Sequence, residues 1–301
     1  MSARTIHYRG TVLRTAIFLF VLLMAVQVNA RDRALYLQLP DATEDALPGL
    51  LERMAASKPD GEARVASTQA VAKLLERGHT DAVTDRALET LGAIGTPAAG
   101  PVLGQYAHHR RVAARARAFT ALGRVAGSDR ALRELVANGL RDSAPEVRAA
   151  AARSLETLKA TEATPVLLKA LGRGVPEAAV TLGAIGDASS LAGYHTYLRK
   201  QPLDVMLTGY ERYVLRPDLS EKAKLDVIAR LEDVSGPAVL RFTSALARRP
   251  QLPAAVQQAA AAAMLRIAKA QSQAAGGATA PAPAPGKQPA AANPQPNGAK
   301  P

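Results

Sequence analysis

Few residues in this 301-residue chain are suited to catalytic or metal chemistry. It has no cysteine, which excludes disulfides, thiol nucleophiles and cysteine-ligated metals. His108 and His109 are adjacent, and neighbouring side chains on a helix point about 100° apart, which is poor geometry for sharing one metal ion. The sequence also lacks a phosphate-binding glycine loop, a Gly-x-Ser-x-Gly elbow and a His-Glu-x-x-His helix. We therefore expect no catalytic residue, no metal and no cofactor, and we predict that the protein is not an enzyme.

Arginines concentrate between residues 110 and 133 of a chain whose formal net charge is +12. Only Asp129 within this segment and Glu134 directly after it oppose them. The cluster consists of Arg110, Arg111, Arg115, Arg117, Arg124, Arg130 and Arg133.

The expected helical faces select some of these arginines as candidates for binding. If Ala114, Ala118, Leu122 and Val125 form the buried stripe of one helix, Arg117 and Arg124 point away from it, and Arg153 does so on a later helix. Guanidinium groups bind carboxylates and phosphates through paired hydrogen bonds. The alternative is a solvated face in a chain that favours arginine over lysine. The predicted partner-binding arginines are Arg110, Arg111, Arg117, Arg124 and Arg153.

Four tyrosines form a second candidate site. Tyr194 and Tyr197 lie three residues apart on one expected helix, as do Tyr210 and Tyr213 on the next. If exposed, they would form a binding hot spot for a partner. The alternative is that they fill the core between two helices where the repeat pattern weakens.

Helical segments follow one another along the chain and predict an all-α fold. We expect helices at 42–56, 62–77, 81–94, 98–108, 111–125, 129–140, 145–158, 162–171, 176–185, 188–198, 204–215, 220–231, 237–247 and 253–270. The better-patterned helices align on Leu91, Leu122, Leu155 and Leu182, which are 31, 33 and 27 residues apart. That spacing is typical of two short helices plus turns, and it predicts an α-solenoid of antiparallel helix pairs.

The segment from Asp142 to Arg148, with Ala151, Leu155 and Pro165, resembles the HEAT repeat, in the variety first described in phycobilisome lyase subunits. The resemblance covers roughly residues 81 to 198. It implies that the helix bearing Val147 and Arg148 lines the concave side of the solenoid. It also implies that Asp142 and Arg148 take part in an inter-repeat ladder. Arg115 is the equivalent of Arg148 in the preceding repeat, but no aspartate stands in the matching position before it.

Both ends of the chain differ in composition from its helical body. Residues 1–30 combine Arg4, Arg9 and Arg14, an apolar run over residues 16–26 and the small-residue site Val28-Asn29-Ala30, which predicts a cleaved secretory signal peptide. The run is too short to span a bilayer, which needs about 20 apolar residues. Residues 271–301, rich in alanine and proline, are expected to be a disordered tail. The solenoid is therefore expected to occupy residues 31–270.

These expectations favour a non-enzymatic protein-protein interaction scaffold in the periplasm or cell envelope of a Gram-negative bacterium, binding partners on its concave face. The alternative is a subunit or regulator of an envelope enzyme, to which the solenoid presents a substrate. The expected partner is a protein, possibly acidic in keeping with the basic chain. No nucleic acid is expected, and membrane contact only transiently during export.

Overall fold

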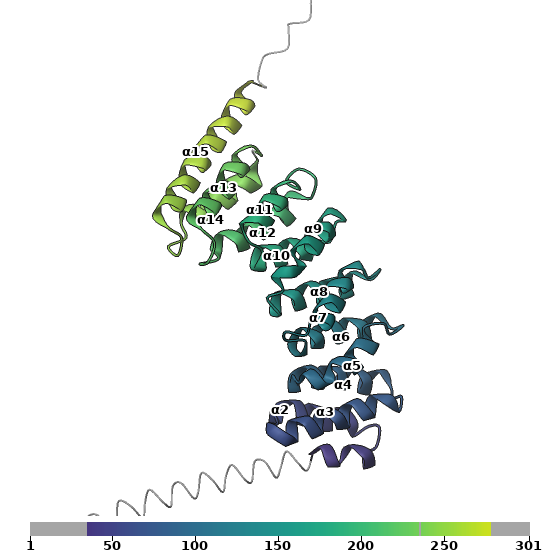
Figure 1. The fold of residues 1–301 in the computed structure, drawn as a ribbon. Helices are drawn as coiled ribbons and strands as arrows, with labels where there is room; N and C mark the ends of the chain where they lie inside the picture. Colours follow the sequence, from purple (N-terminus) through teal and green to yellow (C-terminus); the bar gives the residue numbers. More distant parts are fainter. Residues whose placement is uncertain (1–34, 235, 278–301) are drawn as a thin grey trace, which may run out of the picture.

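The computed structural model describes residues 35–234 and 236–277, and every regular element in these two ranges is a helix. Antiparallel helix pairs follow one another to form an elongated, curved stack (Figure 1). This arrangement confirms the all-α solenoid. The expected signal peptide, residues 1–30, lies outside the described residues, as do residues 278–301 of the expected tail.

The helices form two layers, which we call the even layer and the odd layer after the helix numbers. The even layer contains α2 (Leu47–Ser57), α4 (Asp81–Ile94), α6 (Val112–Val125), α8 (Pro145–Thr157), α10 (Pro176–Ile185), α12 (Leu203–Leu215) and α14 (Pro237–Ala247). The odd layer contains α3 (Gly61–Glu76), α5 (Gly100–Tyr106), α7 (Arg130–Asn138), α9 (Thr164–Gly172), α11 (Ala188–His195), α13 (Glu221–Glu232) and α15 (Ala254–Gly277). Short 3₁₀ turns η1 (Leu39–Asp41), η2 (Pro97–Ala99), η3 (Gly139–Arg141) and η4 (Thr161–Ala163) complete the described elements.

Successive helices of the even layer pack closely because small residues stand where they meet. A Cβ atom on Gly92 would lie 2.9 Å from Ala121, and one on Gly123 would lie 2.7 Å from the Cβ of Ser154. At Gly183 a Cβ would lie 2.4 Å from the carbonyl oxygen of Gly209. Helices α4, α6, α8, α10 and α12 therefore approach one another almost backbone to backbone.

Side-chain hydroxyls add hydrogen bonds across these contacts. Thr90 of α4 donates to the carbonyl of Leu51 at 3.1 Å, and Ser154 of α8 donates to that of Phe119 at 2.8 Å. Thr181 of α10 continues the pattern by donating to Ala152 at 3.1 Å. Each of these hydroxyl residues directly precedes one of the aligned leucines. The bonds therefore recur with the sequence repeat and fix the height of each helix against its neighbour.

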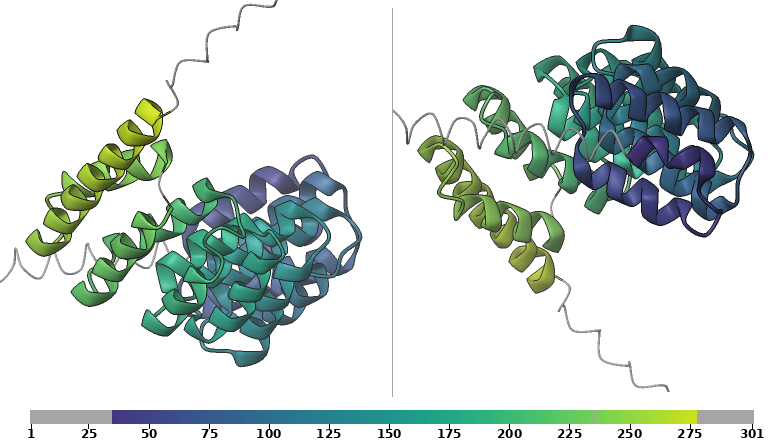
Figure 2. Two further views of the ribbon diagram at one scale, coloured as in Figure 1. Left: turned by 90° about the horizontal axis from the view of Figure 1, so that it is seen from above. Right: turned by 90° about the horizontal axis from the view of Figure 1, so that it is seen from below.

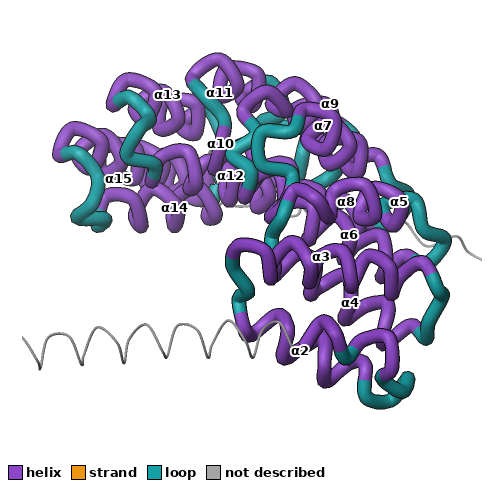
Figure 3. The backbone as a smooth tube through the Cα atoms, turned by 60° about the horizontal axis from the view of Figure 1, so that its bottom comes forward, coloured by secondary structure: helices purple, strands orange, loops and turns teal. Residues whose placement is uncertain are grey.

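The aligned leucines form the centre of the core. Leu91, Leu122, Leu155 and Leu182 have no exposed surface, which confirms the register used to find the repeats. Because the even layer is the more tightly spaced one, the stack bends toward it. In Figure 3 the helices α5 to α13 of the odd layer follow the outer side of the bend, while α6 to α14 of the even layer follow the inner side. Helix α8, with Val147 and Arg148, thus lies on the concave side, as the resemblance implied.

The C-terminal end is packed differently from the rest. Helices α13, α14 and α15 pack on one another, whereas α14 touches α12 much less than other successive even helices touch. Viewed along the stack, α14 and α15 stand off to one side (Figure 2). Helix α15 continues to Gly277, past the expected boundary at Ala270. Residues 271–275 are glutamine, serine and alanine, of which alanine and glutamine are good helix formers, so the helix extends into the composition that predicted disorder.

The close contact at Gly123 makes a stability prediction. Gly123→Ala should lower the free energy of unfolding by about 1 to 3 kcal/mol, because the new methyl group must push α6 away from α8. Gly104→Ala in α5 is the matched control, since its Cβ would meet only the Leu135 side chain at 3.6 Å. The control should be neutral or stabilise by up to about 1 kcal/mol through helix propensity. Urea unfolding followed by circular dichroism measures both, and equal effects would show that the close approach does not govern stability.

Candidate partner-binding surface

Two of the candidate arginines are bound to acidic residues of the preceding even helix. Arg111 donates from Nη2 to Asp85 at 2.5 Å and lies 3.1 Å from Asp81 through Nε. The hydrogen bond to Asp85 is the main reason that the pKa of Arg111 is raised above its usual value. Arg117 contacts Asp85 at 3.3 Å and Glu89 at 3.1 Å. These carboxylates neutralise both arginines from helix α4, some 26 to 32 residues earlier in the chain.

Arg124 and Arg153 are different, because both are exposed and neither side chain has a hydrogen bond or ion pair within residues 35–234 and 236–277. They lie on the successive even helices α6 and α8. On one side of them is the neutralised network of α4 and α6, and on the other Arg212 of α12 pairs with Glu156 of α8 at 3.0 Å. The centre of the even-layer surface therefore carries two unpaired guanidinium groups, and the same surface also carries Glu146 at the start of α8 and Glu177 at the start of α10.

Arg110 is also exposed, but it lies in the turn before α6 and not on that helix. Its backbone carbonyl accepts a hydrogen bond from Arg115 at 3.1 Å. The structure therefore places Arg110 at an edge of the stack, apart from the strip formed by Arg124 and Arg153.

Asp142 forms the expected inter-repeat contact, with Arg115 of the preceding repeat. Its carboxylate accepts two hydrogen bonds from Arg115, from Nε and Nη2, both at 2.8 Å. These bonds are the main cause that holds the pKa of Asp142 below its usual value. Arg148 donates from Nη1 to the backbone carbonyls of Asp142 and Ser143, at 3.0 and 2.9 Å. The expectation for Arg148 is thus corrected, because it bonds within its own repeat.

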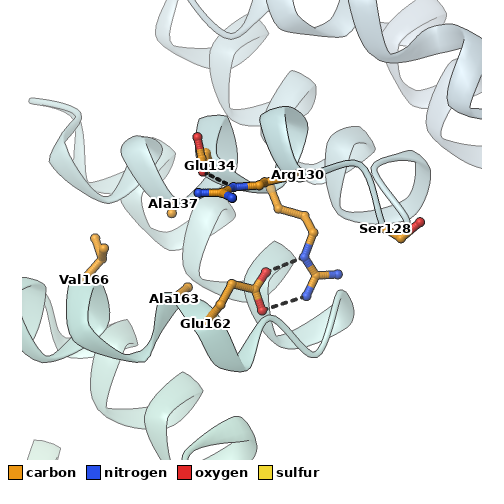
Figure 4. Close-up of a pocket in the computed structure, with 8 residues that line it drawn as sticks. Ser128, Arg130, Glu134, Ala137, Glu162, Ala163 and Val166 are labelled. Carbon is orange, nitrogen blue, oxygen red and sulfur yellow. Dashed lines mark hydrogen bonds and ion pairs between the residues drawn. The ribbon is translucent and has the colours of Figure 1, made fainter.

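A hollow of about 480 Å³ lies between α7 and α9 in the odd layer (Figure 4). Arg133 crosses it to the Glu162 carboxylate and donates to the carbonyls of Gly127 and Leu158, while Arg130 pairs with Glu134 at 2.8 Å. Every charged group that lines the hollow has an opposite charge beside it. It therefore offers a partner no free charge.

The prediction that the four tyrosines form a binding surface is wrong for three of them. Tyr194, Tyr210 and Tyr213 have no exposed surface and pack edge to face on one another, with ring centroids of Tyr194 and Tyr210 4.9 Å apart. The Tyr194 hydroxyl donates to Met206 at 3.0 Å and occupies the space that a side chain on Gly209 would fill. Burial raises the pKa of Tyr213 to about 12. These rings are core, the alternative that the sequence left open, and only Tyr197 is half-buried at the surface.

Comparison with known families gives the class of the central repeats. Residues 103–178 match the family model of HEAT repeats. This segment consists of HEAT repeats. It runs from α5 into α10 and contains Arg115, Asp142, Arg148, Arg124 and Arg153. HEAT repeats generally bind protein partners and are typically non-catalytic.

The chain is also similar to solved structures, at low sequence identity. No curated protein matches the chain. Among solved structures it is similar to an engineered protein, at 16% identity over 79% of this chain and 97% of the other, with a TM-score of 0.39. It is also similar to a chain from work on computationally designed, self-assembling cyclic homo-oligomers, at 13% identity over 85% and 96% of the two chains, with a TM-score of 0.17.

After the HEAT-repeat segment, His195 at the end of α11 contacts side chains of α12 and α13. Its Nδ1 lies 2.8 Å from the Tyr210 hydroxyl of α12, and its Nε2 lies 2.9 Å from the carboxylate of Asp226 in α13. Desolvation by burial lowers the pKa of His195, although Asp226 opposes this effect. The described residues contain no group of histidine, aspartate and glutamate side chains that would hold a metal. His195 therefore acts as a polar link between helices.

This link makes stability depend on pH. Because folding lowers the pKa of His195 below its unfolded value of about 6.5, the unfolded chain binds the proton more tightly. The contribution of His195 is present above that pH and is lost as pH falls through the folded pKa. Between pH 7.5 and pH 5 the native chain should lose more unfolding free energy than His195→Gln, measured by urea unfolding. Parallel losses in the two proteins would contradict the assignment.

Proposed function

We propose that this protein is a non-enzymatic scaffold that binds an acidic protein partner on the even-layer surface, around Arg124 and Arg153. The observation that carries the proposal is the isolation of these two cations: both are exposed and lack an ion pair in the described part of the chain, while Arg111, Arg117 and Arg212 around them are neutralised. Exposed ion pairs add little to folding stability, so leaving two arginines free costs the fold little. The same charges direct association with a surface of opposite sign.

The concave shape supports this choice of surface. The even layer lies on the inner side of the bend, where several successive helices face a bound partner together (Figure 3). Thr120 and Thr157 are also exposed there, one on each helix that carries a free arginine. Each hydroxyl donates within its own helix, Thr120 to the carbonyl of Ala116 and Thr157 to that of Arg153, so the free donors at these positions are the two guanidinium groups. A carboxylate-rich protein surface matches these donors.

We further propose that the scaffold works in the periplasm or cell envelope after removal of residues 1–30. The support is the combination of Arg4, Arg9 and Arg14 with the apolar run and the Val28-Asn29-Ala30 site. None of the helices in residues 35–234 and 236–277 is long and apolar enough to cross a membrane. Intact mass of the protein recovered from the cell envelope tests the location, and a chain that retains residues 1–30 would overturn it.

Charge reversal tests the binding surface. Arg124→Glu with Arg153→Glu should abolish capture of proteins that the native chain retains from envelope extract, without loss of helicity. The control is Arg241→Glu with Arg248→Glu. It makes the same change in net charge at two exposed arginines, one in α14 and one directly after it, and should leave capture intact. Raising salt to about 0.5 M should weaken native binding, because the Debye length falls well below 10 Å. Quantitative mass spectrometry of the retained proteins measures all three, and equal retention by the two double variants would contradict the proposal.

A further inference from the structure

Five of the six turns that lead from an odd helix to the next even helix carry an exposed cation, and the sixth, between α13 and α14, contains Asp233 instead. The first four of these cations are arginines without a side-chain hydrogen bond or ion pair to any residue that the structure describes, and the ammonium of the fifth lies 6.0 Å from the centre of the Tyr197 ring. We call this set the cation edge. It consists of Arg77, Arg110, Arg141, Arg173 and Lys200.

The topology places these five residues in one row. In a stack of antiparallel helix pairs, all odd-to-even turns lie on one edge and all even-to-odd turns on the other (Figure 1). Packed helices lie about 8 to 10 Å apart, so the cations follow one another at roughly 10 Å. The cation edge is therefore a single row of positive charges, spaced one repeat apart.

The opposite edge shows that this row is not a general excess of arginine. Its turns mix both signs, with several acidic residues beside the cations Lys58, Lys159, Arg216, Arg248 and Arg249. The acidic residues of these turns are Asp60, Asp129, Glu162, Asp187 and Asp218.

The acidic residues near the cation edge do not neutralise it. Asp81 is paired with Arg111, and Asp142 is held by Arg115. Glu146 and Glu177 begin α8 and α10, but relative to the aligned leucines they occupy the positions of Ala113 and Arg117, which belong to the even-layer surface. Glu76 and Asp204 lie near Arg77 and Lys200 at the two ends of the row, so the positive charge is kept at Arg110, Arg141 and Arg173.

The helix dipole does not account for the row. A cation in the last turn of a helix is favoured by the negative end of the dipole, which would suit Arg77 and Arg173. The effect falls off within that turn, and Arg110 lies four residues beyond Tyr106, the end of α5. A ligand of opposite charge explains all members of the row.

The same edge already binds one carboxylate, that of Asp142. Arg115 is anchored by Nη1 to the carbonyls of His109 and Arg110, and its remaining Nε and Nη2 hold Asp142. Arg148 is anchored in the same way one repeat later, but its Nε is buried without a partner, which leaves Nη2 as the nitrogen available to a ligand. The turn before α10 contains Arg173, Gly174 and Val175, and thus no carboxylate to bind Arg148.

We propose that the cation edge binds an extended acidic segment of a protein, with one carboxylate on Nη2 of Arg148. A chain in the polyproline II conformation advances about 3.1 Å per residue with three residues per turn, so every third side chain lies on the same side and three residues span roughly one repeat. Carboxylates at every third position therefore meet Arg110, Arg141 and Arg173 in turn. This surface is separate from the one around Arg124 and Arg153, and each can fail without the other.

Two labelled peptides of about fifteen residues test the spacing, using fluorescence anisotropy with the full chain. One has glutamate at every third position, separated by serine and glycine, and the other has the same composition with its glutamates contiguous. The periodic peptide should bind at least about fivefold more tightly, because only it places one carboxylate per repeat. Equal affinity for the two peptides would overturn the proposal.

Matched variants test the residues. Arg110→Gln with Arg141→Gln and Arg173→Gln should weaken binding of the periodic peptide by about tenfold. The control is Arg53→Gln with Arg241→Gln and Arg248→Gln, which removes three exposed arginines elsewhere on the molecule and should change affinity by less than about twofold. Arg148→Gln alone should weaken binding more than Arg173→Gln alone, since the Arg148 side chain is already held in place by hydrogen bonds from its Nη1 to two carbonyls.

Three outcomes would overturn the proposal. Equal losses in the two triple variants would mean non-specific attraction. A lower unfolding free energy of the first triple variant with unchanged peptide affinity would assign the row to helix stability. Binding to vesicles containing about a third anionic phospholipid, lost in the first triple variant while neither peptide binds, would assign the row to a membrane surface.

Discussion

The close packing of the even helices is the constraint on which the rest of the structure depends. Glycine, alanine and serine at the crossing points let backbones approach until side-chain hydroxyls of Thr90, Ser154 and Thr181 reach carbonyls of the preceding even helix. The odd helices, with larger residues such as Leu132 and Leu135 between them, stay further apart. The difference in spacing bends the stack and leaves hollows such as the one between α7 and α9 on the outer side.

That spacing also decides which charges meet. A residue on one even helix faces the residues about thirty positions away, on the helix before or after it. Arg111 and Arg117 therefore find Asp85, and Arg115 finds Asp142, although none of these pairs is close in sequence. The charges left over, at Arg124, Arg153 and along the turns, are those for which the neighbouring repeat supplies no carboxylate.

The sequence predicted the fold well because its signals are local and repeated. Helix boundaries follow prolines, glycines and apolar periodicity, and the register on Leu91, Leu122, Leu155 and Leu182 needs only the spacing of one residue type. The binding site was harder to predict because pairing is not local. A count over residues 110 to 133 misses Asp81, Asp85 and Glu89, which neutralise two of the predicted arginines. The clue to the correct answer was the repeat length itself, which places these acidic residues beside the arginines.

The tyrosines illustrate a different limit. Spacing of three residues puts Tyr210 and Tyr213 on one helical face, but it does not say whether that face is inside. The decisive residues are Gly186 and Gly209, whose missing side chains make room for the hydroxyls of Tyr213 and Tyr194. Volume lost at a glycine in one helix is thus filled by a ring from another. Such compensation becomes visible only when both helices are placed.

The recurring glycine and hydroxyl contacts also bear on how such a chain changes length over evolution. Gly92 meets Ala121 and Gly123 meets Ser154, so the lower surface of one unit fits the upper surface of any other. Duplication or loss of one whole unit rejoins matching surfaces, whereas loss of a single residue within an even helix turns everything beyond it by about 100°. Proteins with this architecture can therefore become longer or shorter by whole repeats of about thirty residues. An insertion inside an even helix, by contrast, disrupts the packing of the repeat.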